Sequence, residues 1–247
     1  MNQTYLSWDV GPVQPLLQNQ EVHIWYADLN LSENLIQLMG NVLNQDEKDR
    51  AARFVRDEDR LHFIAARSIL RNILSRYCHC APENIQFNYN AKGKPFLNVE
   101  QMQLDIQFNL SHSHGVALYA ISLIENIGID IEYNQRQIHP LDIAQRFFSN
   151  EEITLLSQLP ASEQLTGFYK IWTRKEAYVK AIGEGISHPF DQFSVDLMNN
   201  KSKIKLNAAK GKLSEWTIYE ILTDTKYSAA LALPFDEPII HYWRWQK

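Results

Sequence analysis

The stretch "NIGIDIEYN", residues 126–134, alternates three isoleucines with a glycine, an aspartate and a glutamate. Successive side chains of a β-strand point to opposite faces of its sheet. The three isoleucines therefore share one face, while Gly128, Asp130 and Glu132 share the other. This pattern predicts a strand whose isoleucines build a core and whose carboxylates point together in the opposite direction.

The two carboxylates allow two interpretations. Asp130 and Glu132 lie either on the solvated outer face of a half-exposed strand or at a site. Aspartate is depleted in strands, and like charges at positions i and i+2 repel each other. A hard cation such as Mg²⁺ relieves this repulsion, because it binds carboxylate oxygens and retains several waters.

Two long helices are predicted, one on each side of this strand. An apolar stripe with helical spacing runs from Arg60 to Tyr77. A second helix is expected over residues 163–182, with Ser162 as its N-cap and Gly183 just beyond its end. Each half of the chain therefore contributes one long helix.

Alternating or continuous apolar runs predict the strands, at residues 22–29, 84–90, 104–110, 115–124, 192–197, 215–222, 227–233 and 239–245. The elements recur in a similar order before and after Glu125. The sequence therefore predicts an α+β fold with two similar subdomains, residues 1–124 and 125–247. Each is expected to hold a small antiparallel sheet and a long helix.

The second predicted helix carries unexpected charges. Lys175 falls within its apolar stripe, and Glu176 and Lys180 are neighbours at i, i+4. One interpretation is a surface ion pair, with Lys175 at the edge of the core and its ammonium group in solvent. The other places these charges at a site.

A polar segment, "FNLSHSHG", joins two predicted strands through Ser111, His112, Ser113 and His114. Hydroxyl and imidazole groups in a turn can bind phosphate. Histidines two residues apart, such as His112 and His114, can also share a zinc ion. A polar turn without a ligand is the third interpretation.

Basic residues concentrate early in the chain. Eight of the 24 lysines and arginines lie between Lys48 and Arg76, with only four acidic residues among them. Arg60, Arg67 and Arg71 fall on one helical face. This segment either binds a polyanionic ligand or forms a solvated helix face.

Composition excludes several classes. A net charge of −5 gives no reason to expect nucleic-acid binding, and no apolar run approaches the roughly 18 residues of a membrane span. The N-terminal residues lack a signal-peptide pattern. Cys78 and Cys80, the two cysteines of the sequence, are expected to be reduced thiols, and the protein is expected in the cytoplasm.

Five motifs occur in order: "GKPFL" at 93–97, "FNLSHSHG" at 108–115, "GIDIE" at 128–132, "RFFSNEE" at 146–152 and "WTRKEAYVKAIGEG" at 172–185. Together, over about residues 46–197, they resemble the Sfp-type 4′-phosphopantetheinyl transferases. The resemblance implies a monomer whose two halves are related by pseudo-twofold symmetry, with the active site in the cleft between them. It implies transfer of the phosphopantetheine arm of coenzyme A to a serine of an apo acyl or peptidyl carrier protein, which releases adenosine 3′,5′-bisphosphate.

By the same resemblance, Asp130, Glu132 and Glu176 are expected to bind Mg²⁺, with Mn²⁺ as an alternative ion. Lys180 is expected to contact the pyrophosphate or the reacting groups, with Lys175 nearby.

The resemblance also assigns contacts to coenzyme A. Ser111 and His112 match positions that hold the nucleotide end with its 3′-phosphate, and Lys94 matches a position near the adenine or a phosphate. Arg50 and Arg53 match basic positions that contact phosphates. A family lysine is replaced here by Glu47, and the loop "SHSHG" carries one residue more than the "SHSG" of many relatives.

The general base has three candidates. Glu152 aligns with a residue proposed for this role in the family, but Ser149 and Glu152 also have the spacing of a helix capping box. Glu176 or a water held by the metal ion are the others.

Two other functions are compatible with parts of the sequence. A metal-dependent phosphohydrolase would use His112 and His114 with Asp130 and Glu132 around zinc or manganese. A non-catalytic carrier-binding protein would bind the same partner without transfer.

Overall fold

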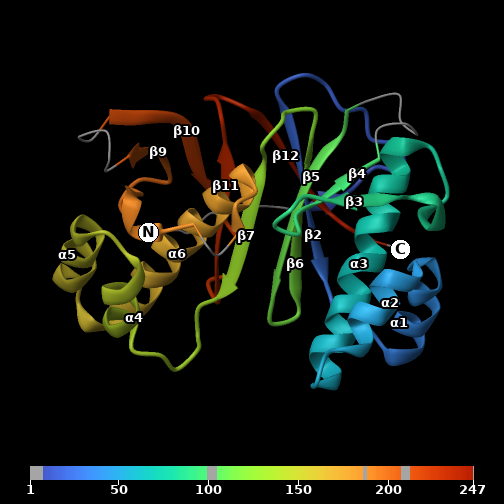
Figure 1. Cartoon of the computed structure of the whole chain (residues 1–247), viewed down its shortest axis with the longest axis horizontal. Coiled ribbons are helices and arrows are strands. Elements are labelled where there is room, and N and C mark those ends of the chain that lie inside the picture. Colours follow the sequence, from blue (N-terminus) through green and yellow to red (C-terminus); the bar gives the residue numbers. More distant parts are fainter. Residues whose placement is uncertain (1–7, 99–104, 186–187, 207–211, 247) are drawn as a thin grey trace.

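The computed structural model describes residues 8–98, 105–185, 188–206 and 212–246. Within them lie two five-stranded sheets, ordered β1-β12-β2-β6-β5 and β7-β11-β10-β9-β8. Figure 1 shows α3 and α6 on opposite sides of the molecule, with strands of both sheets between them. The α+β class with two subdomains is confirmed.

The first half contains the elements β1 (Asp9–Val10), β2 (Glu21–Asp28), α1 (Glu33–Met39), α2 (Gln45–Ala52), α3 (Asp57–Cys78), β3 (Phe87–Tyr89), β4 (Pro95–Leu97), β5 (Gln107–Ser113) and β6 (Val116–Ser122). The strands β3 and β4 pair as a separate hairpin. Helix α3 packs on the first sheet, where the hydroxyl of Tyr119 donates to the carbonyl of Ala66.

The second half contains β7 (Gly128–Tyr133), α4 (Pro140–Phe147), α5 (Asn150–Gln158), α6 (Ala161–Ile182), β8 (Phe193–Ser194), β9 (Lys201–Leu206), β10 (Lys212–Glu220), β11 (Tyr227–Leu233) and β12 (Ile239–Arg244). The order strand, helices, long helix, strands repeats that of the first half. Both α3 and α6 have 22 residues.

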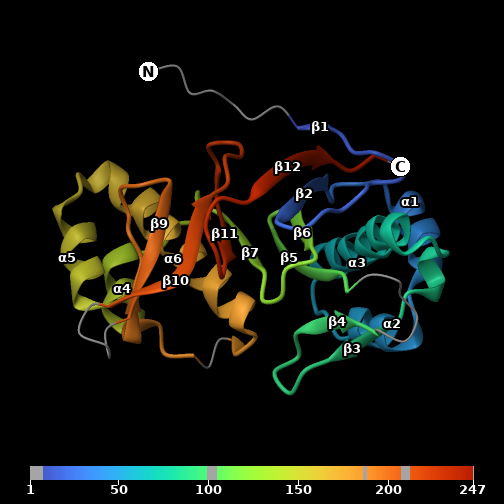
Figure 2. The same cartoon turned by 90° about the horizontal axis from the view of Figure 1, so that it is seen from above.

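The last strand departs from the predicted division at residue 125. The strand β12 pairs in parallel with β2, so it belongs to the sheet of the first half (Figure 2). That sheet is consequently not purely antiparallel. Periodicity identified β12 as a strand, but pairing depends on distant partners that a local pattern does not contain.

The isoleucine face of the opening stretch is confirmed as core. Ile127, Ile129 and Ile131 are at most 1% exposed and pack with Ile24 and Leu118 of the first sheet and with residues of β11. This cluster joins the two halves. The carboxylates on the opposite face of β7 therefore point away from the inter-sheet core, toward the side covered by α6.

Two local predictions on turns and caps are corrected. Ser111, His112 and Ser113 belong to β5, and the turn consists of His114 and Gly115, both with positive φ, as two-residue hairpins require. The N-cap of α6 is Pro160 rather than Ser162. Gly183 ends α6 in the left-handed conformation, as expected.

Among the described residues, the helices are too short or too polar to cross a membrane.

Gly128 is required where α6 approaches β7. A Cβ added there would lie 2.0 Å from the carbonyl oxygen of Ala177. We expect Gly128→Ala to lower the free energy of unfolding by at least 1–3 kcal/mol, roughly the cost of overpacking a core. Urea denaturation checks this.

Gly40→Ala is the control. Gly40 has an ordinary helical φ, so this substitution should change the free energy of unfolding by less than about 1 kcal/mol. Equal effects of the two variants would contradict the close approach.

Candidate active site

Polar side chains of β5 hold the free edge of β7. The Oδ1 atom of Asn109 accepts a hydrogen bond from the backbone N–H of Ile129 at 2.9 Å. The Oγ atom of Ser113 accepts from the N–H of Tyr133 at 3.1 Å. The side chains of Asn109 and Ser113 thus accept from backbone N–H groups of β7 that, in a continuous sheet, would pair with the backbone of an adjacent strand. The alternation in "FNLSHS" thus fixes β7 beside β5 (Figure 1).

A cavity of about 710 Å³ opens between the two halves beside this junction. Eight of the predicted site residues line it: Arg50, Lys94, Ser111, His112, Asp130, Glu132, Glu176 and Lys180. They come from α2, the β3–β4 turn, β5, β7 and α6. Residues that are scattered over 131 positions of the sequence therefore meet at one pocket.

Asp130 is the centre of a buried polar cluster. Its Oδ1 atom accepts hydrogen bonds from the ammonium group of Lys180 at 2.5 Å and from the hydroxyl of Ser111 at 2.8 Å. Its Oδ2 atom is buried and has no hydrogen-bond partner among the described residues. A buried carboxylate oxygen without a partner is costly, so this position favours an additional positive ligand.

Burial and the charge of Asp130 both change the pKa values of the other two carboxylates, Glu132 and Glu176. Burial, followed by the charge of Asp130, raises the pKa of Glu176 to about 7. The same two causes, in the same order, raise the pKa of Glu132. Glu132 also accepts a hydrogen bond from Ser113 at 2.9 Å. Two cations offset part of this repulsion: Arg136 lies 3.4 Å from Glu132, and Lys180 contacts Asp130.

The three carboxylates fit a hard divalent cation. They offer oxygen ligands only, their charges repel one another, and Asp130 Oδ2 is an unused buried acceptor. Their oxygens do not yet converge within 4.8 Å as a set. Lys180 instead lies against Asp130 Oδ1.

The raised pKa of Glu176 has a consequence for the apo protein. Its folded-state pKa of about 7 exceeds the ordinary value, so this side chain favours folding at low pH and loses that contribution as pH rises toward 7. Without metal, Glu176→Gln should therefore match wild type near pH 5 and exceed its stability at pH 8 by roughly 1–3 kcal/mol. Denaturation at both pH values in a chelator measures the difference. A variant less stable than wild type at pH 8 would contradict it.

The predicted nucleotide-binding residues lie along one wall. Ser111 contacts both Asp130 and Lys180. The His112 side chain lines the pocket and is exposed there. Desolvation by the neighbouring protein atoms, followed by the positive charge of Lys180, lowers the pKa of His112 to about 4. The ammonium group of Lys94 donates to the carbonyls of Ile127 and Ala181, and burial lowers its pKa to about 8. Lys94 thus also connects the two halves.

The basic segment divides into two groups. Arg50 lies on the pocket wall, with its guanidinium 5.5 Å from the centre of the Phe63 ring. Arg53 is exposed at the C-terminus of α2 and does not line the pocket. Arg67 and Arg71 are buried, so the interpretation of a shared solvated face with Arg60 does not hold for them.

Glu47 explains why these two arginines are buried. Its carboxylate accepts from Arg67 at 2.7 Å and from Arg71 at 2.7 Å, and it completes the capping box of α2 with Asn44. Glu47 is therefore a buried counterion rather than a phosphate contact. It fixes α2, which carries Arg50, against α3.

Glu152 and Lys175 are not brought to the pocket. Both side chains are fully buried, and their charged groups are 2.9 Å apart. The ammonium group also donates to the carbonyls of Phe190 and Phe193, and Glu152 completes a capping box with Ser149. All the ammonium donors of Lys175 are thus directed to the interior of the second half, which gives the pair a structural role in this arrangement.

The histidine pair does not form a metal cluster with the carboxylates. His114 occupies the hairpin turn and stacks on Tyr133, with ring centres 4.1 Å apart. Within the described ranges, neither His112 nor His114 belongs to a group of three ligand atoms within 4.8 Å. The described geometry therefore separates His114, which stacks on Tyr133 in the turn, from the carboxylates that line the pocket.

Two pocket residues, Tyr89 and Lys92, were not singled out by sequence reasoning, whereas Arg67 belongs to the basic segment noted there. Arg67, Tyr89 and Lys92 line the cavity, and Arg67 donates to the Tyr89 hydroxyl at 3.3 Å. Lys92 belongs to the turn "NAKGKP", and its positive charge was the one feature in the sequence that could have indicated a contact with an anionic ligand. The position of Tyr89 follows from the hairpin β3–β4, whose placement is a tertiary property.

Comparison with known proteins agrees with this arrangement. A model described as "4′-phosphopantetheinyl transferase superfamily" matches residues 126–232, and one described as "4′-phosphopantetheinyl transferase, N-terminal" matches residues 30–122. The two matches leave residues 123–125 between them.

Three curated relatives illustrate the range of similarity. The 4′-phosphopantetheinyl transferase HetI of Nostoc sp. (strain PCC 7120) is 36% identical over 92% of this chain and 93% of its own length. The 4′-phosphopantetheinyl transferase Sfp of Bacillus subtilis (strain 168) is 32% identical over 70% of this chain and 74% of its own. The human L-aminoadipate-semialdehyde dehydrogenase-phosphopantetheinyl transferase is 28% identical over 77% and 67%. With these matches over both halves, the chain belongs to the Sfp-type 4′-phosphopantetheinyl transferases.

Proposed function

We propose that this phosphopantetheinyl transferase moves the phosphopantetheine arm of coenzyme A onto a serine of an apo acyl or peptidyl carrier protein. The supporting observation is the pocket that gathers Asp130, Glu132, Glu176 and Lys180 with basic residues of the first half. Coenzyme A is a long polyanion, so a pocket with carboxylates at one point and cations along its walls suits its pyrophosphate.

In the proposed reaction the serine oxygen of the carrier attacks the phosphorus that bears the pantetheine arm. The bond between that phosphorus and the bridging oxygen breaks, and adenosine 3′,5′-bisphosphate leaves with that oxygen. Such a displacement depends on alignment and on neutralising the phosphoryl oxygens. Lys180, beside Asp130 and Ser111, is placed to supply one positive charge there.

We propose that Asp130, Glu132 and Glu176 hold Mg²⁺, or Mn²⁺ as an alternative. The bound ion would supply positive charge to the pyrophosphate oxygens. Lys180 would then exchange its contact with Asp130 for a contact with phosphate. The Lys180 side chain is 27% exposed and lines the pocket, so this movement requires no unfolding.

Glu176 is our preferred residue for accepting the serine proton. Of the two candidate glutamates, it is the one that lines the pocket, whereas Glu152 is sealed against Lys175. A water molecule held at the carboxylates is the alternative acceptor.

We further propose that the enzyme works as a cytoplasmic monomer. The monomeric state is the one that the resemblance to this family implies. Within the described residues Cys78 and Cys80 are both in the thiol form, not joined in a disulfide, which fits a reducing compartment.

Arg50 and Arg53 form a matched pair for testing coenzyme A binding. Arg50→Ala removes a cation from the pocket wall and should raise KM for coenzyme A about tenfold, with little change in kcat. Arg53→Ala removes the same charge outside the pocket and should leave KM within about twofold. Steady-state kinetics with a fixed carrier checks both. If Arg53→Ala raised KM for coenzyme A more than Arg50→Ala, the phosphates of coenzyme A would bind outside this part of the pocket.

One assay tests the proposed function as a whole. The protein is incubated with coenzyme A, Mg²⁺ and an apo carrier protein, and the carrier is weighed by mass spectrometry. A mass gain of one phosphopantetheine group, absent when the carrier serine is replaced by alanine, supports the proposal. A carrier that binds but never gains mass would indicate a non-catalytic binding protein.

A further inference from the structure

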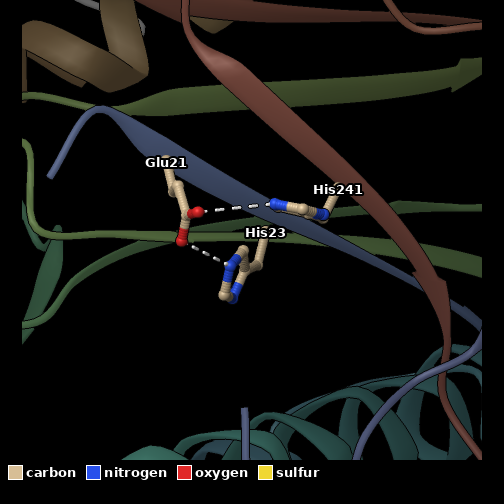
Figure 3. A group of neighbouring side chains, drawn as sticks. All are labelled: Glu21, His23 and His241. Atoms are coloured by element: carbon tan, nitrogen blue, oxygen red, sulfur yellow. Dashed lines mark ion pairs between the residues drawn. The ribbon is translucent and has the colours of Figure 1, made fainter. Parts of the chain in front are cut away.

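A second cluster of potential ligands lies outside the active-site pocket. Glu21 and His23 come from β2 and His241 from β12, and their side chains point toward one another (Figure 3). The parallel register pairs His23 directly with His241. Glu21 precedes His23 by two residues and so shares its face of the sheet. The backbone thus brings two imidazoles and a carboxylate to one point.

The distances in this cluster suit a shared metal ion better than direct hydrogen bonds. His23 Nε2 lies 3.5 Å from Glu21 Oε2, and His241 Nε2 lies 3.6 Å from Glu21 Oε1. Hydrogen bonds between such atoms are normally about 2.7–3.2 Å long. Two ligands of a tetrahedral zinc ion, each bound at about 2.0–2.1 Å, are roughly 3.3 Å apart. All three ligand atoms lie within 4.8 Å of one another.

The surroundings orient the ligands. The Nδ1 atom of His23 lies 2.9 Å from the hydroxyl of Tyr77, which also accepts a hydrogen bond from the indole of Trp25 at 2.8 Å. This contact occupies Nδ1 and directs Nε2 toward Glu21. Metal-binding histidines typically have such a partner on the second ring nitrogen. The backbone N–H of Gln18 holds the Glu21 carboxylate at 2.9 Å.

Burial and charge also suit a cation. The side chains of His23 and Glu21 are 1% and 10% exposed, while that of His241 is 41% exposed. The exposed side at His241 leaves an entry path for an ion from solvent.

We propose that Glu21, His23 and His241 form a binding site for a divalent transition metal of the zinc class, separate from the active site. Two imidazoles and one carboxylate are a ligand set that zinc accepts, whereas Mg²⁺ prefers oxygen ligands alone. The ion would fasten β12, near the end of the chain, to β2. Within the described part of the chain, this is the one group of three such ligands that close together.

Cobalt substitution distinguishes this site from the active-site carboxylates. The full-length protein is freed of metal by a chelator, and Co²⁺ is added in the presence of excess Mg²⁺, which competes for the all-oxygen site. Four-coordinate Co²⁺ with nitrogen ligands absorbs visible light far more strongly than six-coordinate Co²⁺ with oxygen ligands. We expect absorption that saturates at one Co²⁺ per chain and disappears when Zn²⁺ is added.

Three variants and one control locate the ion. His241→Ala and Glu21→Gln each remove a ligand and should weaken binding more than about 100-fold, beyond the roughly 10–100-fold loss expected for the orienting variant Tyr77→Phe. His139→Ala removes an exposed histidine elsewhere and should leave the titration unchanged. Circular dichroism confirms folding, and Zn²⁺ should raise Tm in wild type but not in His241→Ala.

The possible results are decisive for the cluster. Loss of the absorption in both folded ligand variants, with binding retained in His139→Ala, supports the site. No absorption in wild type, or an unchanged titration in folded His241→Ala and Glu21→Gln, would show that the cluster is only a polar contact between two strands. Neither result depends on transfer activity.

Discussion

Asp130→Asn is expected to reduce kcat/KM for transfer by about 10³-fold while leaving the protein folded. The substitution keeps the size of the side chain and an oxygen that can accept from Ser111, but it removes the charge that would hold a cation. Loss of one preorganised electrostatic group typically costs about 10²–10³ in rate, and loss of the ion adds to it. Rates measured with an apo carrier at saturating Mg²⁺ test this.

The thermal response to ligands provides an independent measurement. Mg²⁺ with coenzyme A should raise Tm of the wild type, because ligands that bind only the folded state stabilise it. The increase should shrink in Asp130→Asn. Asp142→Asn, an exposed aspartate of α4, is the control and should behave as wild type. If Asp130→Asn kept the Mg²⁺-dependent increase in Tm, or kept activity within tenfold of wild type, the assignment of these carboxylates to the metal site would be wrong.

Lys175→Met is expected to destabilise the protein by about 3–5 kcal/mol, a typical cost of leaving one member of a buried ion pair unpaired. Both Lys175 and Glu152 have fully buried side chains, and the ammonium group also satisfies two backbone carbonyls. Methionine keeps the length of the side chain but leaves the Glu152 carboxylate without its counterion. Urea denaturation measures the loss.

The neighbouring residue gives the control for this experiment. Glu151 also pairs with a lysine, Lys205, but both side chains are about half exposed. Glu151→Gln should therefore cost less than about 1 kcal/mol. If Lys175→Met does not fold well enough to measure, the milder Glu152→Gln should show the same direction of change.

Activity per folded molecule separates the structural role from a catalytic one. We expect both Glu152→Gln and Lys175→Met to retain kcat within about tenfold, because neither side chain lines the pocket. A folded Glu152→Gln variant with normal stability and kcat reduced by 10³-fold would reverse this interpretation and make Glu152 the base.

Local patterns were sufficient for most elements. Alternation in residues 126–134 predicted β7 and its buried isoleucine face, and the apolar stripes predicted α3 and α6. The helix end at Gly183 and the capping boxes at Asn44 and Ser149 depend on hydrogen bonds between residues close in sequence, so the sequence pattern indicates them. The same reasoning placed the turn of "SHSHG" too early, because serines and histidines are as compatible with an edge-lining strand as with a turn.

The sequence by itself determined the family, the α+β class and the set of charged residues to examine, because motifs and periodicity are local properties of the chain. Only the tertiary structure decided which of those charges share a pocket. Lys175 and Glu176 are adjacent, yet one is sealed against Glu152 and the other faces Asp130, since successive residues of a helix point about 100° apart. The placement of β12 beside β2, and with it the cluster of Glu21, His23 and His241, depends on a pairing across more than 200 residues that no local pattern specifies.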